Sequence, residues 1–272
     1  MRREFDETGA VPPAAGASGA VSATGAGANS TGGVCPATMP VAERFISING
    51  EGRSAGKLAA FIRFTGCNLR CSYCDTMWAN EPDAASAAET LGIDALTAWV
   101  REVHVEHVTL TGGEPALQPL LPDLIAALLA DAGPDGRGLA VEVETNGAAD
   151  LAPLVALRER LSDTAQGALS FTVDWKLPAS GMEQHMIAGN FALIDARDTV
   201  KFVCGSEDDL SRALEVAREL DLPRRVAVYL SPVFGRIEPA AIVEFMQQND
   251  MRWATMQLQL HKIIWPNVEK GV

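Results

Sequence analysis

Residues 60–74 read AFIRFTGCNLRCSYC, and no other stretch of the sequence is as informative. A short run of β-forming residues leads directly into three cysteines, Cys67, Cys71 and Cys74, spaced C-x3-C-x2-C. Iron–sulfur cubes are normally held by four thiolates, so three thiolates on one loop would leave one iron open to a ligand that is not protein. An open coordination position distinguishes a catalytic metal site from a closed structural one. The loop is therefore predicted to present a reactive iron to a small molecule.

Structural zinc and disulfide bonds are the alternative uses of such cysteines. Structural zinc usually shows two well-separated pairs of cysteine or histidine ligands. This chain has one cysteine cluster, and its four histidines form no H-x3-5-H pair. Five cysteines in 272 residues are also too sparse for a disulfide scaffold. A non-catalytic iron–sulfur or zinc module is the alternative that stays open.

Composition narrows the classes of function. The formal net charge of −13 disfavours nucleic acid, whose phosphates require basic surfaces. A chain of this length suits one large domain or two small ones, and 47% of its residues are apolar. No apolar run follows the N-terminus, and no stretch approaches the length of a membrane span. We therefore expect a cytoplasmic protein that binds neither membranes nor nucleic acid, and the free thiols suit a reducing compartment.

The first part of the chain differs in texture from the rest. Residues 1–39 are rich in Ala, Gly, Ser, Thr and Pro and are predicted to be disordered, because they cannot bury enough apolar surface to offset the entropy of ordering. Cys35 lies in this tail and is expected to be an incidental thiol. Residues 40–272 are predicted to form a single catalytic domain.

Alternating strand and helix signals fill that domain. The predicted strands are residues 60–64, 107–110, 139–143, 169–173, 199–203 and 226–230. Helical patterns lie between them: Ser206 and Asp209 form a capping-box signal, and further helices are expected to begin near Leu120 and Glu238. Such alternation predicts an α/β fold with a parallel sheet. Since six units are fewer than the eight of a closed barrel, we expect a partial, open parallel β/α barrel.

Unusual motifs follow the ends of these strands. The cysteine loop follows the first, TGGEP (111–115) the second, ETNG (144–147) the third, DWK (174–176) the fourth and SPVFG (231–235) the sixth. The carboxyl ends of parallel strands meet at one rim, where ligands bind. Gly112 and Gly113 alone would indicate a turn, but the adjacent Glu114 favours close approach to a ligand. Asn146 and Gly147 are expected to form a turn without chemistry.

Single residues in this pattern have two interpretations. Arg63 alternates with Ile62 and Phe64 and so lies on the opposite face of its strand. It either faces solvent or, if buried in a barrel interior, clamps a carboxylate of the substrate. Lys176 has the same two interpretations, and Cys204 is expected to be a small buried apolar residue.

From Gly66 to Thr76 the chain resembles the radical S-adenosylmethionine (radical SAM) enzymes and, more narrowly, the 7-carboxy-7-deazaguanine synthases. The resemblance covers most of the chain after the tail. It includes NGEG (49–52), TGGEP (111–115), DWKLP (174–178), SPVFG (231–235) and QLHKIIW (259–265). It implies a radical-SAM-like fold.

The resemblance also implies an activity and its cofactors. A 4Fe-4S cluster, S-adenosylmethionine and Mg²⁺ would serve a lyase that contracts the ring of 6-carboxy-5,6,7,8-tetrahydropterin, with loss of ammonia, to 7-carboxy-7-deazaguanine, a precursor of queuosine and other deazapurines. An electron donor such as flavodoxin or ferredoxin and assembly as a homodimer are implied as well. A glycyl-radical-enzyme activase, or another radical SAM enzyme, is the rival within the superfamily.

Positions of this chain that match the family's motifs imply roles for particular residues. Each implied role is one of binding, because in such enzymes the cofactor carries the chemistry. The implied cluster ligands are Cys67, Cys71 and Cys74, and Thr76 matches a ligand of Mg²⁺. The positions that match the cofactor site are Tyr73, Asp75, Gly113, Glu114, Lys176 and Ser231. The positions that match the substrate site are Asn49, Gly50, Arg63 and Thr111.

Overall fold

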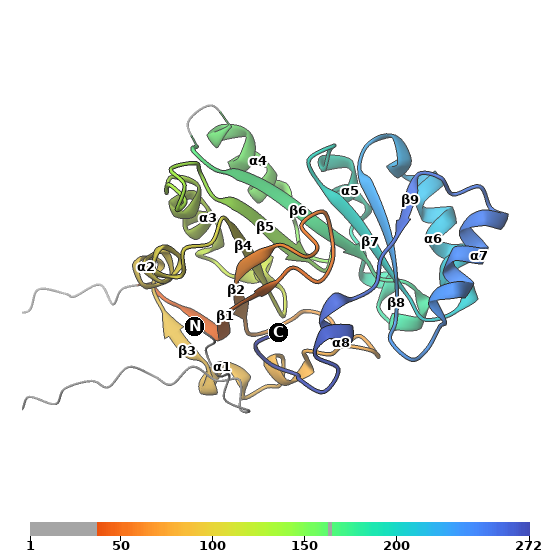
Figure 1. Cartoon of the computed structure of the whole chain (residues 1–272), viewed down its shortest axis with the longest axis horizontal. Coiled ribbons are helices and arrows are strands. Elements are labelled where there is room, and N and C mark those ends of the chain that lie inside the picture. Colours follow the sequence, from red (N-terminus) through yellow and green to blue (C-terminus); the bar gives the residue numbers. More distant parts are fainter. Residues whose placement is uncertain (1–36, 163–164) are drawn as a thin grey trace, which may run out of the picture. The chain divides into compact units, whose positions relative to one another are not determined.

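A computed structural model describes residues 37–162 and 165–272 (Figure 1). Residues 1–36, which hold most of the predicted disordered tail and Cys35, lie outside the described residues. Strand β1 (Met39–Ile48) begins at Met39, inside the range assigned to that tail. The division into a tail and one catalytic domain stays a prediction.

The described strands form one nine-stranded sheet in the order β3-β1-β2-β4-β5-β6-β7-β8-β9. Strands β2 to β9, apart from β3, pair in parallel, whereas β1 pairs antiparallel with β2 and with β3. The remaining strands are β2 (Leu58–Phe64), β3 (Glu89–Leu91), β4 (His107–Gly112), β5 (Ala140–Thr145), β6 (Ala168–Trp175), β7 (Thr199–Cys204), β8 (Ala227–Pro232) and β9 (Ala254–Met256). All six predicted strands are present, and the open, mostly parallel α/β architecture is confirmed. Strands β1, β3 and β9 were not predicted.

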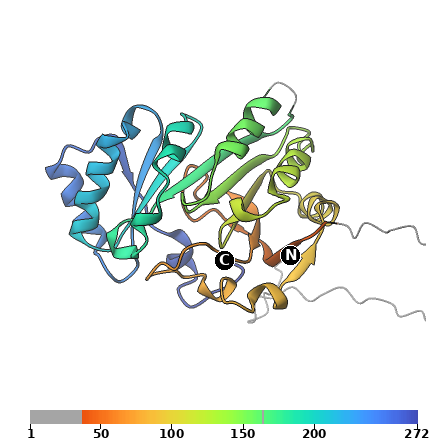
Figure 2. The ribbon, with the colours of Figure 1, turned by 180° about the vertical axis from the view of Figure 1, so that it is seen from behind.

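Helices separate the parallel strands along the chain. They are α1 (Ala84–Ala87), α2 (Ile93–Val103), α3 (Leu121–Leu129), α4 (Ala152–Leu161), α5 (Ala188–Leu193), α6 (Glu207–Glu219), α7 (Pro239–Gln248) and α8 (Leu260–Ile264). Figures 1 and 2 show α2 to α7 along one side of the curved sheet. The expected cap of α6 is present, since the Ser206 hydroxyl accepts a hydrogen bond from the backbone N–H of Asp209. Within the described ranges, no helix has the length and apolar character needed to cross a bilayer.

Alternation along the central strands gives the sheet two unlike faces. On what we call the outer face, apolar side chains pack against the helices in the core; they include Val108, Leu110, Val141, Val143, Phe171, Val173, Val200, Phe202, Val228 and Leu230. The residues between them point to the opposite, inner face. These are mostly polar or charged: Thr109, Thr111, Glu142, Glu144, Thr172, Asp174, Lys201, Tyr229 and Ser231.

The sheet does not close through strand pairing. Instead, the loop between β1 and β2 bonds to the segment that follows β9. The backbone N–H of Gly52 donates to Gln257 Oε1 at 2.6 Å, and Gln257 Nε2 donates back to the Gly52 carbonyl at 3.1 Å. The Leu260 N–H donates to the Gly50 carbonyl at 3.2 Å. We call this junction the seam. It is closely packed at position 50, where a Cβ would lie 2.9 Å from His261 Nδ1, so a larger residue there would displace the His261 ring.

Candidate active site

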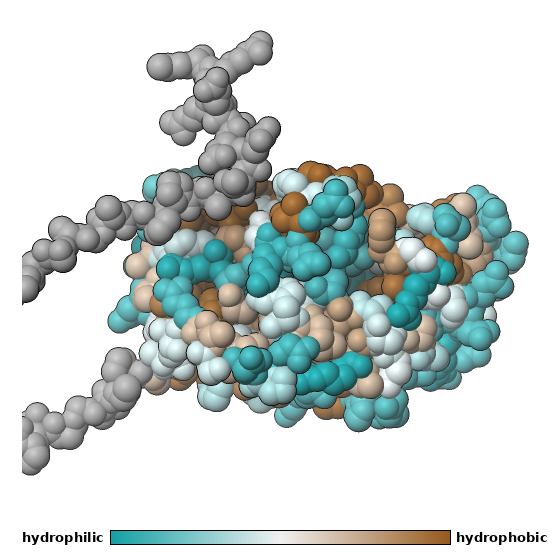
Figure 3. Space-filling model, turned by 90° about the horizontal axis from the view of Figure 1, so that it is seen from below, coloured by the Kyte–Doolittle hydropathy of each residue, from teal (hydrophilic) through white to brown (hydrophobic). Residues whose placement is uncertain are grey.

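A cavity of about 1110 Å³ opens at the carboxyl ends of the strands. The loop after β2, the ends of β4, β5 and β6, and the last part of the chain line it. Figure 3 views the side of the molecule on which the loop after β2 and α8 lie, and shows hydrophilic and hydrophobic residues mixed over that face. The predicted rim of strand ends therefore encloses a space large enough for a nucleoside cofactor and a bicyclic substrate.

Most of the predicted site residues line this one cavity. They are Gly50, Arg63, Cys67, Cys71, Tyr73, Cys74, Asp75, Thr76, Thr111, Gly113 and Lys176. Asn49, Glu114 and Ser231 are buried and are not among the lining residues.

The three cysteines of the loop are free and partly exposed. Burial raises the pKa of the Cys67 and Cys71 thiols, so iron would have to displace a proton from each. Among residues 37–162 and 165–272, no three Cys, His, Asp or Glu side chains lie close enough to hold one single ion. A cube carries its irons on separate corners, so each thiol would meet its own iron. Three thiols around one cavity thus fit such a cluster.

Hydrogen bonds hold the cysteine loop in place. The Arg70 guanidinium donates to the carbonyls of Cys67 at 3.2 Å, Leu69 at 3.0 Å and Asn80 at 3.0 Å. At the other end of the loop, Ser72 donates through its backbone N–H to the Ser180 carbonyl at 3.0 Å. Because these bonds form within the protein, the loop is preorganised for its ligand.

The Gly113–Glu114 pair serves two purposes. A Cβ at Gly113 would collide with the Gly66 carbonyl and with Asn80 Oδ1, so only glycine permits this approach beside the cysteine loop. The Glu114 carboxylate is fully buried and accepts from the backbone N–H of Ala116 at 3.0 Å and of Asn146 at 2.7 Å, and from the Thr145 hydroxyl at 2.8 Å. Gly113 lines the cavity as expected, whereas the Glu114 side chain ties β4 to β5.

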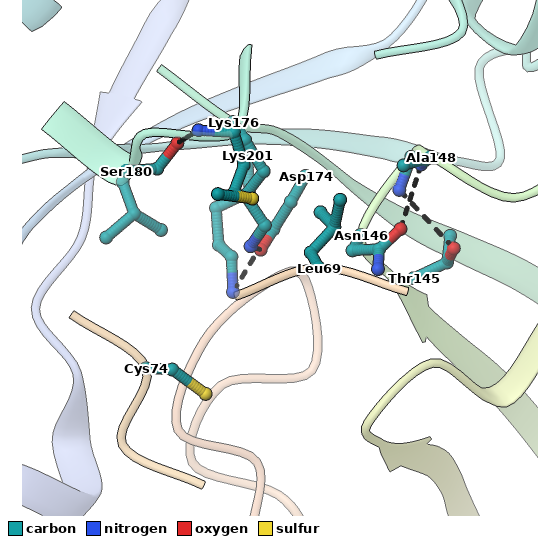
Figure 4. Close-up of polar contacts among 12 residues, drawn as sticks. Leu69, Cys74, Thr145, Asn146, Ala148, Asp174, Lys176, Ser180 and Lys201 are labelled. Carbon is teal, nitrogen blue, oxygen red and sulfur yellow. Dashed lines mark hydrogen bonds and ion pairs between the residues drawn. The ribbon is translucent and has the colours of Figure 1, made fainter. Parts of the chain in front are cut away.

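Charged side chains are ion-paired at the cavity, whose lining includes Glu51, Asp174 and Lys176. Asp174 bonds Lys176 at 2.5 Å and lies 3.4 Å from Lys201, which also bonds Glu51 at 2.9 Å. Figure 4 shows the Asp174 carboxylate close to the ammonium groups of Lys176 and Lys201. Burial alone would raise the pKa of Asp174, but the two lysines outweigh it and hold the pKa below its ordinary value. Lys176 is therefore an ion-paired cavity residue rather than a solvated surface lysine.

Of the four residues expected at the substrate site, all but Asn49 line the cavity. Arg63 lines the cavity, and its Nε bonds Glu43 Oε1 at 2.7 Å. Asn49 lies below the lining, where its Oδ1 accepts from the Thr109 hydroxyl at 2.8 Å. Asn49 therefore lies behind the cavity wall rather than at its surface.

Several buried polar atoms at the site have no hydrogen-bond partner among the described residues. They are Glu51 Oε1, Trp78 Nε1 and Asn80 Oδ1, all on residues that line the cavity, and Asn49 Nδ2 and Ser231 Oγ just outside it. An unpaired buried polar atom costs about 1–3 kcal/mol. Their grouping here indicates that a polar ligand completes them.

Other lining residues were not predicted. The segment after α8 covers part of the cavity through Pro266, Asn267 and Val268, and the Gly271 N–H donates to Glu43 Oε2 at 3.0 Å. Lys262 lies 3.0 Å from Asp75. Burial would raise the pKa of Asp75, but His261 and Lys262 lower it well below its usual range.

Asn146 was expected to form a turn without chemistry, and the structure shows further contacts of its side chain. It does begin a turn, but it also lines the cavity, and its Nδ2 lies 3.4 Å from Cys67 Sγ. The signal that could have identified it is its position after Glu144, on the rim shared by the other motifs.

Comparisons with known proteins agree with this geometry. Residues 61–174 match the radical SAM superfamily. The chain is 44% identical over 232 residues to a 7-carboxy-7-deazaguanine synthase of Clostridium acetobutylicum, covering 85% of this chain and 98% of the relative. It is 34% identical to the enzyme of that name from Chlorobaculum tepidum, covering 87% of this chain and 98% of the relative. The crystal structure of QueE from Escherichia coli has the same fold, with a TM-score of 0.59 at 21% identity over 82% of this chain and 94% of the other.

Proposed function

The chain belongs to the radical SAM superfamily and, within it, to the 7-carboxy-7-deazaguanine synthases, and from this we propose that it converts 6-carboxy-5,6,7,8-tetrahydropterin to 7-carboxy-7-deazaguanine with loss of ammonia. It is then a lyase of queuosine and deazapurine biosynthesis. The supporting observation is that Cys67, Cys71 and Cys74 line the same cavity as the motifs at the strand ends. A cluster held by these cysteines would have its open iron next to a space for cofactor and substrate.

The family implies a 4Fe-4S cluster and S-adenosylmethionine. Bound together, they supply the one-electron chemistry that removes a hydrogen atom from the substrate. The three cysteines would hold the cluster. Tyr73, Asp75, Gly113 and Lys176, which line the cavity, would contact the cofactor. Ser231 and the Glu114 side chain are buried just outside the lining.

Substrate binding falls to residues around Arg63 in this proposal. The Arg63 guanidinium would bind the substrate carboxylate, and its bond to Glu43 fixes the direction in which the remaining N–H groups point. The unpaired Glu51 Oε1 would accept a hydrogen bond from a ring N–H. Gly50 and Thr111 also line the cavity, and Asn49 lies behind the lining, where it bonds Thr109. Holding the reacting carbon close to the cofactor is the main task of these residues, because a carbon radical attacks almost any neighbouring C–H bond.

We also infer a Mg²⁺ ion at Thr76. Its hydroxyl lines the cavity beside the cysteine loop, 3.7 Å from Cys74 Sγ, and Mg²⁺ prefers oxygen ligands. A flavodoxin- or ferredoxin-type electron donor and a homodimeric assembly stay predictions from the resemblance.

The direct test is anaerobic reconstitution of the full chain with iron and sulfide, followed by addition of the tetrahydropterin, S-adenosylmethionine, Mg²⁺ and a reductant. We expect 7-carboxy-7-deazaguanine and ammonia in equal amounts. Formation of 5′-deoxyadenosine without the deazaguanine would point to another radical SAM enzyme. No cleavage of S-adenosylmethionine at all would favour a non-catalytic metal-binding module.

A further inference from the structure

Asn146 stands at the carboxyl end of β5 and is 7% exposed. Its side-chain amide has one possible orientation. Oδ1 lies 2.8 Å from the backbone nitrogen of Ala148 (Figure 4). Since a backbone N–H can only donate, the oxygen must face Ala148, and the NH₂ group must point the other way.

The NH₂ group of Asn146 points to the cysteine loop. Nδ2 lies 2.8 Å from Asn68 Oδ1 and 3.4 Å from Cys67 Sγ. The orientation of Asn68 is fixed in the same manner, because its Nδ2 donates to the Ala148 carbonyl at 2.8 Å and a carbonyl can only accept. The backbone of Ala148 thus fixes the orientation of both side-chain amides. The group of Asn146 that faces Cys67 must therefore be the NH₂ group, which donates.

Cys67 differs from the other two cysteines in its surroundings. Its sulfur faces two N–H donors, Asn146 Nδ2 and the backbone N–H of Leu69, each at 3.4 Å. In the described ranges, no N–H donor is found at the sulfur of Cys71 or of Cys74. Among the residues that the structure describes, the Thr76 hydroxyl is the one hydrogen-bond partner found at the Cys74 sulfur, at 3.7 Å.

The position of Asn146 is itself enforced. Its backbone N–H donates at 2.7 Å to Glu114 Oε2, and the preceding Thr145 hydroxyl donates at 2.8 Å to Glu114 Oε1. Glu114 is fully buried, so these charge-assisted bonds are shielded from water. The buried carboxylate after Gly113 therefore anchors the residue that faces the Cys67 sulfur.

We propose that Asn146 is a positioning residue that raises the reduction potential of the cluster by donating a hydrogen bond to the Cys67 thiolate; this rests on the proposed function, which supplies the cluster. A cube gains one negative charge on reduction, and N–H donors to its sulfurs stabilise that charge. Glu114 acts indirectly, because its carboxylate holds the backbone of Asn146 in place. Asn146 tunes how readily the cluster takes an electron from its donor.

The test is a potentiometric titration of the reconstituted full chain, followed by the EPR signal of the reduced cluster, without S-adenosylmethionine or substrate. Asn146→Asp keeps the shape and removes the donor, and Asn146→Ala removes the side chain. Both are expected to shift the midpoint potential to more negative values, Asn146→Asp the more strongly, at an unchanged iron and sulfide content. Ser72→Ala is the matched control, because Ser72 anchors the same loop but bonds no sulfur; its potential is expected to equal that of the wild type.

Wild-type potentials in both Asn146 variants would overturn the inference. So would a rise in KM for S-adenosylmethionine with no change of potential, since Asn146 would then be a cofactor contact. A shift of equal size in Ser72→Ala would also overturn it, because general loosening of the loop would then explain the effect. A wild-type chain that assembles no cluster would overturn the proposed function together with this inference, whereas an intact cluster with unshifted potentials would overturn this inference alone.

Discussion

The outer and inner faces of the sheet share the same strands and have opposite chemistry. In β6, Phe171 and Val173 pack into the core, whereas Thr172 and Asp174, one residue along, point to the inner face. The outer face contributes to stability through apolar burial. The inner face carries charges that cost free energy to bury and are stabilised by ion pairs with one another and, at Glu142, by the Thr172 hydroxyl. The contrast predicts that substitutions on the two faces have separable effects, on folding and on chemistry.

Two cysteines offer the strongest test of that separation. Cys71→Ala removes a proposed cluster ligand at the cavity and is expected to abolish both cluster assembly and turnover, with the fold retained. Cys204→Ala removes a thiol buried in the outer-face core and is expected to cost about 1 kcal/mol of unfolding free energy while the cluster assembles normally. Iron content and chemical denaturation of both variants would measure this. Residual turnover in Cys71→Ala would contradict the ligand assignment.

Neighbouring residues of β6 give the next largest expected effect. Phe171→Ala should lower the free energy of unfolding by about 3–5 kcal/mol, because the ring is fully buried and lies against the Arg158 guanidinium. Thr172→Val, on the inner face, removes a hydrogen bond to Glu142 and is expected to cost only about 1 kcal/mol. Equal losses of stability in denaturant titrations would show that the faces are not separable in this way.

Glu142 adds a pH dependence that belongs to the inner face. Burial, and then the neighbouring Glu144 carboxylate, raise the pKa of Glu142 from 4.5 to about 7. The folded protein therefore holds this proton more tightly than the unfolded chain, so the stabilisation is complete below about pH 4.5 and is lost as the pH rises toward 7. Glu142→Gln should remove that loss and be more stable than the wild type at pH 8 by about 1–3 kcal/mol. A stability–pH profile of the variant that parallels the wild type would contradict this assignment.

The smallest expected effect concerns substrate binding alone. Arg63→Ala should raise KM for the pterin about tenfold, because a charge-assisted bond contributes about 1.5 kcal/mol, and should leave the affinity for S-adenosylmethionine unchanged. Arg101→Ala is the control, since Arg101 pairs with Asp131 on the helix-covered side and lies more than half exposed. Equal losses for both ligands in Arg63→Ala would make Arg63 a structural residue.

The outer face was the predictable part of the fold. Six strands could be predicted because each places alternate apolar residues in the core. Strands β3 and β9 have three residues each, too few to show an alternation of apolar and polar residues. Strand β1 begins at Met39, within the stretch whose composition predicted a disordered tail. The strand-end motifs placed most cavity residues correctly. The contacts of Asn146 with Cys67, 79 positions away, and the covering segment after α8 could not be predicted, because they depend on which distant loops meet in space.

The seam has a consequence for motion. A barrel wall closed by the side chain of Gln257 and a few backbone bonds lacks the cooperative ladder that joins β5 to β6. Such a junction opens locally at a free energy below that of global unfolding, so the amide of Gly52 should exchange its hydrogen with solvent long before the amides of the central strands. We therefore expect the seam to open and close locally while the parallel strands keep their hydrogen bonds.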